Sequence, residues 1–203
     1  MATMLIDANR LKGILLQPGA TWKTIDGEFT KPGSIYKNWV LPLALIGPIC
    51  GAIGTFVFGL SFGPVVGVYR VPITGIGTIA VVDFVFGVVG VWGLSLVISL
   101  LAPTFGGQRN DVQGLKAAAY ASTAWFIAGA FQLVPQLALV RWLVALYSMY
   151  LLFSGVPIVM KPSKDQAMGY AIVAVLGAVV VALLVMAVHT AFTPDYGTLR
   201  ARV

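Results

Sequence analysis

The sequence predicts an all-α membrane protein, a polytopic bundle of about five transmembrane helices preceded by an amphipathic helix at the membrane interface. Three observations carry this prediction. Of the 203 residues, 59% are hydrophobic and 10% are charged, whereas roughly a quarter are charged in an ordinary soluble domain. The apolar residues gather in runs of about 20 or more, which is the length that crosses a bilayer as a helix. The Lys and Arg residues fall mainly between those runs.

Residues 1–35 are predicted to form a cytoplasmic or interfacial segment, and residues 36–203 the transmembrane domain. Near the N-terminus, small and apolar residues share one helical stripe, with Arg10 and Lys12 off it. This pattern favours a helix lying in the membrane interface, with Trp22 as a possible second anchor. An ordinary packing helix is the alternative. The stripe consists of Leu5, Ala8, Leu11 and Leu15.

The spans follow from the apolar runs, and the first should kink because it contains Pro42 and Pro48. The cations concentrate in the N-terminal segment and in the second and fourth connections. The positive-inside rule therefore places the N-terminus in the cytoplasm and the C-terminus outside. The predicted spans are 39–60, 76–101, 115–134, 137–160 and 168–192.

Four of these spans carry rows of small residues at helical spacing. Small residues let helix backbones approach closely in lipid, where packing contacts replace the hydrophobic effect as the driving force. We therefore expect the rows to face the bundle interior. They are Gly47, Gly51 and Gly54; Gly87 and Gly90; Ala117, Ala121, Ala124 and Ala128; and Ala174, Ala178 and Ala182.

Three ionisable residues, Asp83, Arg141 and His189, fall inside apolar runs. Each costs about 2.5 kcal/mol or more near a helix centre, so each is a functional hypothesis. All three are expected in the outer third of the membrane. We predict an Asp83–Arg141 ion pair with His189 and Gln132 beside it. The alternative is that Arg141 extends to the headgroups and His189 lies at the interface.

Catalytic and metal-binding patterns are missing from the sequence. The single His has no Ser or Cys near it in any regular arrangement, and no carboxylate pair is present. Cys50 is the only cysteine, so a zinc site has no thiolate pair. No basic stripe is interleaved with aromatic residues, which argues against nucleic acid as a partner. We therefore expect no enzyme activity, cofactor or metal.

Several short segments, in this order, resemble the bacterial branch of the Yip1 family of multi-span membrane proteins. The resemblance implies five transmembrane helices, a cytoplasmic N-terminus and a place in the bacterial inner membrane. The association of eukaryotic relatives with Rab GTPases is not carried over, because it would rest on fold analogy alone. The segments are Ile14 to Pro18 with Trp22; Tyr36 to Pro48; Pro103 to Gln108, with Phe105, Gly106, Gly107 and Gln108; Ala119 to Ala121; Leu146 to Leu152, with Tyr147 and Tyr150; Gly155 to Met160, with Pro157; and Gly169 with Tyr170.

Two functions remain open at this point. The first is a membrane organiser or scaffold that acts on lipids or partner proteins, with a homo-oligomer or another membrane protein as the expected partner. The second is a small channel or transporter that uses the polar cluster in the outer half of the bundle. The resemblance favours the first, and the intramembrane charges favour the second.

Overall fold

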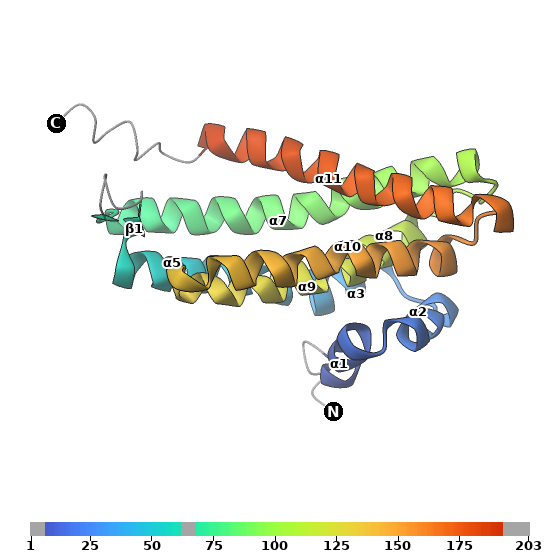
Figure 1. The fold of residues 1–203 in the computed structure, drawn as a ribbon, viewed down its shortest axis with the longest axis horizontal. Helices are drawn as coiled ribbons and strands as arrows, with labels where there is room; N and C mark the ends of the chain where they lie inside the picture. The colour runs from blue at the N-terminus through green and yellow to red at the C-terminus, as the bar shows by residue number, and fades with distance from the viewer. Residues whose placement is uncertain (1–6, 62–67, 193–203) are drawn as a thin grey trace.

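The computed structural model describes residues 7–61 and 68–192. Long helices lie side by side along one axis, and two short N-terminal helices lie against the flank of the bundle (Figure 1). The all-α prediction is confirmed apart from a two-residue pair of antiparallel strands, β1 (Leu60–Ser61) and β2 (Val68–Tyr69). The main helices of the bundle are α5 (Ile46–Phe58), α7 (Ile73–Leu101), α8 (Asp111–Ala121), α9 (Thr123–Ala128), α10 (Ala138–Met160) and α11 (Ala167–Phe192).

Four helical segments among the described residues are long and apolar enough to cross a membrane. The remaining predicted span, 115–134, is a helix broken at Ser122 into α8 and α9 and ending in the 3₁₀ turns of Gly129–Leu133. Its first half contains polar residues such as Gln113 and Lys116. These lower its mean hydropathy, so it is not among the four segments apolar enough to cross a membrane. The four segments are Pro32–Phe58, Ile73–Phe105, Pro135–Met160 and Lys164–Phe192.

The first span is irregular, as its prolines predict. After α3 (Pro32–Ile35), a π-helix occupies Tyr36–Val40 and is followed by α4 (Leu41–Ala44). The helix is interrupted again at Leu45 before α5 begins. Proline has no N–H to donate and its ring displaces the preceding turn, so the backbone changes its winding next to Pro42 and Pro48.

The bundle has two ends. The end nearer the two N-terminal helices is called proximal, and the other is called distal. The proximal end is formed by residues 102–110 and 161–166, which meet where the Ser163 N–H donates to the Phe105 carbonyl at 3.1 Å. The distal end is formed by the β1–β2 pair and residues 134–137 (Figure 1). Short 3₁₀ turns, Ala102–Phe105, Pro135–Leu137 and Lys164–Gln166, lie in the connections at these ends.

The small-residue rows of the first and third predicted spans face the interior, as expected. A Cβ added to Gly51 would lie 2.9 Å from the Gln132 side chain, one on Gly54 would collide with the Gln132 backbone carbonyl, and one on Gly129 would lie 2.6 Å from the Gly47 Cα. The turns after α9 therefore touch α5 almost backbone to backbone. The alanine row Ala117, Ala121, Ala124 and Ala128 is 0–2% exposed.

The rows on α7 and α11 need one correction. Gly87 and Gly90 face neighbouring helices at ordinary contact distance, 3.6 Å from Phe126 and 3.7 Å from Val185 for an added Cβ. On α11, Ala174 is buried and Ala178 half-buried, but Ala182 is exposed. Steps of four residues drift around a helix with 3.6 residues per turn. The contacting face of α11 therefore continues through Gly177, Val181 and Val185.

Candidate functional site

The N-terminal segment folds as a helical hairpin of α1 (Ala8–Leu16) and α2 (Pro18–Gly27). The Asp7 carboxylate caps α1, because its Oδ1 accepts from the Asn9 N–H at 2.9 Å and the Arg10 N–H at 3.3 Å. Pro18 opens α2 at the first helical position, where its missing N–H is no loss. Gln17 alone joins the two helices, so the hairpin is tight.

The apolar side of this hairpin is buried against the bundle and does not face lipid. Ile14, Trp22 and Ile25 are all 0% exposed and belong to the main core. The Trp22 indole lies so close to Gly155 of α10 that a Cβ there would collide with the ring. Glycine at position 155 thus opens the niche that Trp22 fills.

These contacts correct the prediction of an interfacial helix with Trp22 as a lipid anchor. Leu11 and Leu15 of the predicted stripe pack against the core, Ala8 is exposed, and Leu5 lies outside the described residues. An apolar stripe is stabilised equally by protein and by lipid, and in this chain protein covers it. The large apolar side chain that α1 leaves exposed is Leu16, at 78%.

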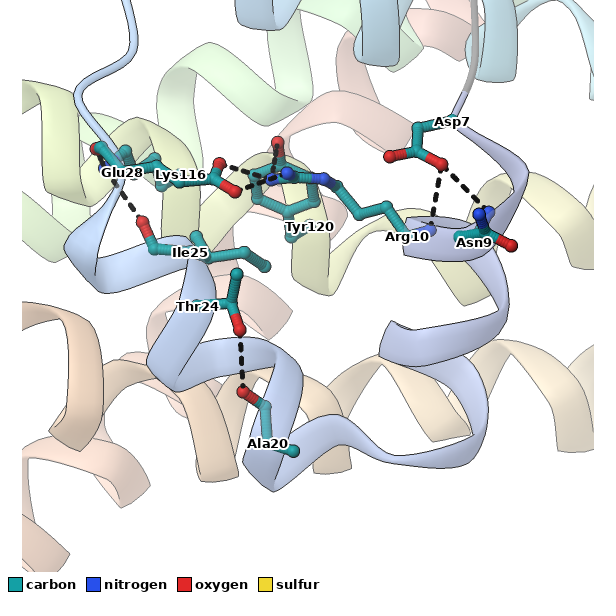
Figure 2. A network of polar contacts seen from close by, with 9 residues as sticks. All are labelled: Asp7, Asn9, Arg10, Ala20, Thr24, Ile25, Glu28, Lys116 and Tyr120. Atoms are coloured by element: carbon teal, nitrogen blue, oxygen red, sulfur yellow. Dashed lines mark hydrogen bonds and ion pairs between the residues drawn. The ribbon is translucent and has the colours of Figure 1, made fainter.

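A polar network fastens the hairpin to the bundle (Figure 2). The Arg10 guanidinium donates to both carboxylate oxygens of Glu28 at 2.5 Å, and also to the Tyr120 hydroxyl at 3.2 Å. It lies over the Tyr120 ring, 5.6 Å from the centroid. The hydrogen bonds to Glu28 raise the pKa of Arg10 above its ordinary value. The two-point geometry of the Arg10–Glu28 pair fixes α1 against the end of α2, and the bond to the Tyr120 hydroxyl ties both to α8.

Lys116 is the deepest member of this network. The residue is only 2% exposed. Its ammonium group donates to the backbone carbonyls of Ile25 at 2.9 Å and Glu28 at 2.5 Å. These carbonyls lie at the C-terminal end of α2, where helix carbonyls lack intrahelical partners and a positive charge is favourable. A cation of α8 therefore caps α2.

Three further contacts extend the attachment. Asp26 accepts from Lys161 at 2.9 Å and from the Gln113 amide at 3.3 Å. The Tyr147 hydroxyl of α10 donates to the Leu15 carbonyl at 2.8 Å. The hairpin is thus tied to α8, to α10 and to the connection after α10 at once.

The hairpin also forms a cavity of about 250 Å³ between α1 and α2, and this cavity is open to the surface. Its lining combines an acid, a base and two hydroxyls with apolar side chains. The lining residues are Asp7, Arg10, Ala20, Thr21, Thr24 and Ile25.

The motif at 105–108 builds the proximal end. Gly106 adopts a left-handed conformation with φ of 71°, which glycine adopts without strain. The Gly107 N–H returns to the Ala102 carbonyl at 3.0 Å. Phe105 stacks on Tyr170 with ring centroids 5.1 Å apart, and the Tyr170 hydroxyl donates to the Ile98 carbonyl. These contacts hold the two proximal connections together, while Gln108 is exposed.

The motif residues of α10 lie on the hairpin side or at the surface. The Tyr147 and Tyr150 rings are 5.3 Å apart, and Tyr150 is 52% exposed. Pro157 is half-buried inside the helix. With Gly155 under Trp22, this part of the family pattern accounts for docking of the hairpin.

The intramembrane ionisable residues pair differently from the prediction. His189 Nε2 lies 2.7 Å from Asp83 Oδ1, joining α11 to α7, with both side chains roughly a quarter to a third exposed. Phe86 packs edge-on against the His189 ring. Asp83 and His189 therefore lie at the same level of the bundle.

Arg141 does not form the predicted ion pair with Asp83. Its guanidinium lies over the Trp142 ring, 5.7 Å from the centroid, and no carboxylate of the described residues is within 4.0 Å of it. Gln132 is also placed elsewhere, against the glycine row of α5. Helix order explains the change of partner, because α11, and not α10, presents its ionisable residue to Asp83.

Sequence reasoning missed the hairpin network, although one signal was present. Lys116 falls one residue inside the predicted span 115–134, so it meets the same criterion that singled out Asp83. Its partners are backbone carbonyls, which carry no sequence signature. Glu28 and Asp26 lie 88 and 87 residues from their partners on α8, and no local pattern joins residues so far apart.

Hairpin docking can be tested by substituting Gly155 with alanine. We expect Gly155→Ala to push α2 away from α10 and to cost about 1–3 kcal/mol of docking free energy, as overpacking does. A loss near 1.4 kcal/mol corresponds to a roughly tenfold higher population of the undocked hairpin. Trypsin cleavage at the exposed Lys12 and Lys23 measures that population. Gly169→Ala is the matched control, because its Cβ would lie at an ordinary 3.6 Å from Phe105. Equal cleavage of the two variants would contradict the docking.

The distal pair can be tested with a double-mutant cycle of Asp83→Ala and His189→Ala. We expect a coupling free energy of about 1 kcal/mol, the usual size for an interhelical polar pair in a membrane protein. The cycle of Asp83→Ala with Arg141→Ala should give a clearly smaller coupling, since those side chains form no ion pair. Unfolding free energies of all variants in one detergent at one pH supply both cycles. A larger coupling to Arg141 would restore the sequence prediction.

Comparison with known proteins places this arrangement in a family. A model described as the Yip1 domain matches residues 12–186, a range that includes the second half of α1, all of α2, the proximal motif and α10. The chain is 27% identical over 161 residues to the inner membrane protein YohC of Escherichia coli K12, covering 78% of this chain and 82% of that protein, and equally to YohC of E. coli O6:H1. No solved structure matches the chain. With a Yip1 domain spanning most of its length, this chain belongs to the Yip1 family of multi-span membrane proteins.

Proposed function

We propose that this protein is a non-enzymatic membrane organiser, a scaffold that acts on lipids or partner proteins through its N-terminal hairpin. The observation that carries the proposal is the docking of that hairpin. Ile14, Trp22 and Ile25 are fully buried and a polar network surrounds them. The hairpin is thus held at a fixed position beside the bundle, as a platform for a partner must be.

The packed interior also favours a scaffold over a conducting path. The alanine row of α8 and α9 fills the space between neighbouring helices, and Ser95, Ser99 and Thr123 are 0–6% exposed. Ser99 donates to Asp111 at 2.8 Å, and Thr123 accepts from the Trp39 indole at 3.1 Å. The Ser99 and Thr123 hydroxyls are thus satisfied by protein, so neither needs a water molecule as partner.

The proximal end, on this proposal, faces the cytoplasm of a bacterium and the bundle lies in the inner membrane. Seven exposed cations lie in the hairpin, at the start of the first span and in the two proximal connections, which agrees with the positive-inside rule. The printed name of the E. coli relatives, an inner membrane protein, supports the same membrane. The seven are Lys12, Lys23, Lys31, Lys37, Arg109, Lys161 and Lys164.

The broad apolar face of α11 supports assembly with a second copy or with another membrane protein. Only 11% of the most apolar 18-residue stretch of this helix is buried within the chain. Lipid or a neighbouring helix covers the rest, including Leu176, Val180 and Leu184.

A second candidate, a small channel or transporter, is favoured by one observation, the Asp83–His189 pair. An ionisable pair in the apolar part of two helices is costly and often marks a proton or ion path. The pair joins α7 to α11 at a side-chain exposure of 31% for Asp83 and 25% for His189. The Asp83–His189 pair is therefore accessible to an ion or a proton carrier from outside the bundle core.

Flux assays separate the two candidates. We expect liposomes containing the purified protein to be as tight to protons and small cations as protein-free liposomes, because the α8–α9 interior is filled. Asp83→Asn, which removes the charge but keeps the size of the side chain, should change nothing. A flux that Asp83→Asn abolishes would establish the channel or transporter function instead.

The orientation has its own test. In a Cys50→Ala background, Ser163→Cys at the proximal end should react with a membrane-impermeant maleimide only after the cytoplasmic side is opened. Gln136→Cys at the distal end should react in intact cells with the outer membrane permeabilised. Both positions are exposed in the structure. Labelling of both from the same side would contradict the proposed arrangement.

A further inference from the structure

The cavity between α1 and α2 has walls of opposite charge. Figure 2 looks into the hairpin, with Asp7 and Arg10 on α1 and Thr24 and Ile25 on α2. At about 250 Å³ it is smaller than the usual pocket for a drug-sized ligand. A ligand that fits it is small and carries matching charges on its two sides.

The negative wall is the Asp7 carboxylate. Its Oδ1 accepts both backbone N–H groups that cap α1. Its Oδ2 has no hydrogen-bond partner among residues 7–61 and 68–192. An ionised carboxylate can accept about four hydrogen bonds, so Asp7 keeps room for a donor such as an ammonium group.

The positive wall is Arg10, backed by Lys116. Glu28 balances one of these two cations, and no ion pair of the described residues joins the Lys116 side chain to a carboxylate. The wall therefore carries a net positive charge. Arg10 has five N–H donors, of which Glu28 and Tyr120 occupy some, so donors remain for an anion.

Two hydroxyls complete the lining. Thr21 and Thr24 donate to the carbonyls of Gln17 at 3.0 Å and Ala20 at 3.3 Å, one turn earlier in α2. These bonds are local and replaceable, because a hydroxyl rotates freely and can donate to a ligand oxygen instead. Hydroxyls beside a guanidinium are a common setting for phosphate oxygens.

We propose that this cavity binds an aminoalkyl phosphate group, with its primary ammonium on Asp7 and its phosphate on the Arg10 side. In a membrane this group is the head of phosphatidylethanolamine. The inference rests on the proposed function, in which the protein acts on lipids through its hairpin. Leu16, exposed at the tip between the two helices, is the apolar side chain that this function brings to the lipid.

The same chemistry predicts which lipids are rejected. A choline head has a quaternary ammonium, which is larger and has no N–H to donate to Asp7. A glycerol head has no cation, so Asp7 would face only hydroxyls beside an anionic phosphate. Phosphatidylethanolamine therefore binds better than phosphatidylcholine and phosphatidylglycerol.

Native mass spectrometry of the full chain in detergent tests this order. The protein is offered equal amounts of the three lipids, and the bound fraction of each is measured. We expect phosphatidylethanolamine to exceed each of the others roughly tenfold, the ratio that one charge-assisted hydrogen bond supplies. Equal retention of the three lipids, together with no binding of soluble phosphoethanolamine, would overturn the proposal.

The informative variant is Asp7→Asn. Asparagine caps helices as well as aspartate does, so α1 is retained while the negative wall is lost. We expect the preference for phosphatidylethanolamine to fall to parity, with trypsin cleavage of the hairpin unchanged. Asp165→Asn is the matched control, since it removes one exposed carboxylate at the same end of the bundle without touching the cavity. A preference that survives Asp7→Asn would also overturn the proposal.

Soluble phosphoethanolamine identifies the source of the ligand. If it displaces the lipid, the head group alone is sufficient, as expected for the cavity. If it binds in an Asp7-dependent manner while no lipid is preferred, the site is confirmed for a soluble aminoalkyl phosphate and the lipid assignment is wrong. The flux assay is independent of both results. A protein that conducts ions and still prefers phosphatidylethanolamine would refute the scaffold function but not the binding site in the cavity.

Discussion

The buried ammonium of Lys116 is the contact on which the proximal half of the molecule depends. A charge taken out of water is costly unless hydrogen bonds replace its hydration. Lys116 obtains them from the Ile25 and Glu28 carbonyls at the end of α2. The same two bonds fix where α2 ends and where the chain turns toward the first span. Glu28 is thereby brought to Arg10, and Arg10 to Tyr120.

The rest of the bundle is organised by close approach of small residues. Glycines of α5 meet the turns after α9 almost without intervening side chains, and alanines fill the contact of α8 and α9 with their neighbours. Larger side chains point outward, where lipid replaces water as their solvent. The hairpin follows the same rule in one place, since Gly155 leaves room for Trp22.

Features set by one segment alone could be predicted from the sequence, and features set by pairs of segments could not. The spans, the kinked first helix and the rows at Gly47 to Gly54 and Ala117 to Ala128 each depend on the spacing within one helix. The partner of Asp83 depends on which helix lies beside α7, and residue depth alone could not distinguish His189 from Arg141. The docking of Trp22 against α10 was missed because an apolar face of an N-terminal helix can be covered either by lipid or by protein. The cavity depends on the angle of two helices joined by one residue, which composition does not encode.

The break at Ser122 has a consequence for how the chain enters the membrane during synthesis. A segment inserts by itself when its residues partition favourably into the bilayer, and Lys or Asp near its centre opposes this by about 2.5 to 3.5 kcal/mol each. The segment from Asp111 to Leu133 begins with a polar turn and a lysine, unlike the four apolar spans around it. Its α8 half becomes stable beside α7 and α10 only when α2 supplies carbonyls for Lys116. Residues of the hairpin are thus required by a helix that is made much later, so α8 reaches its final packing only after both segments have been synthesised.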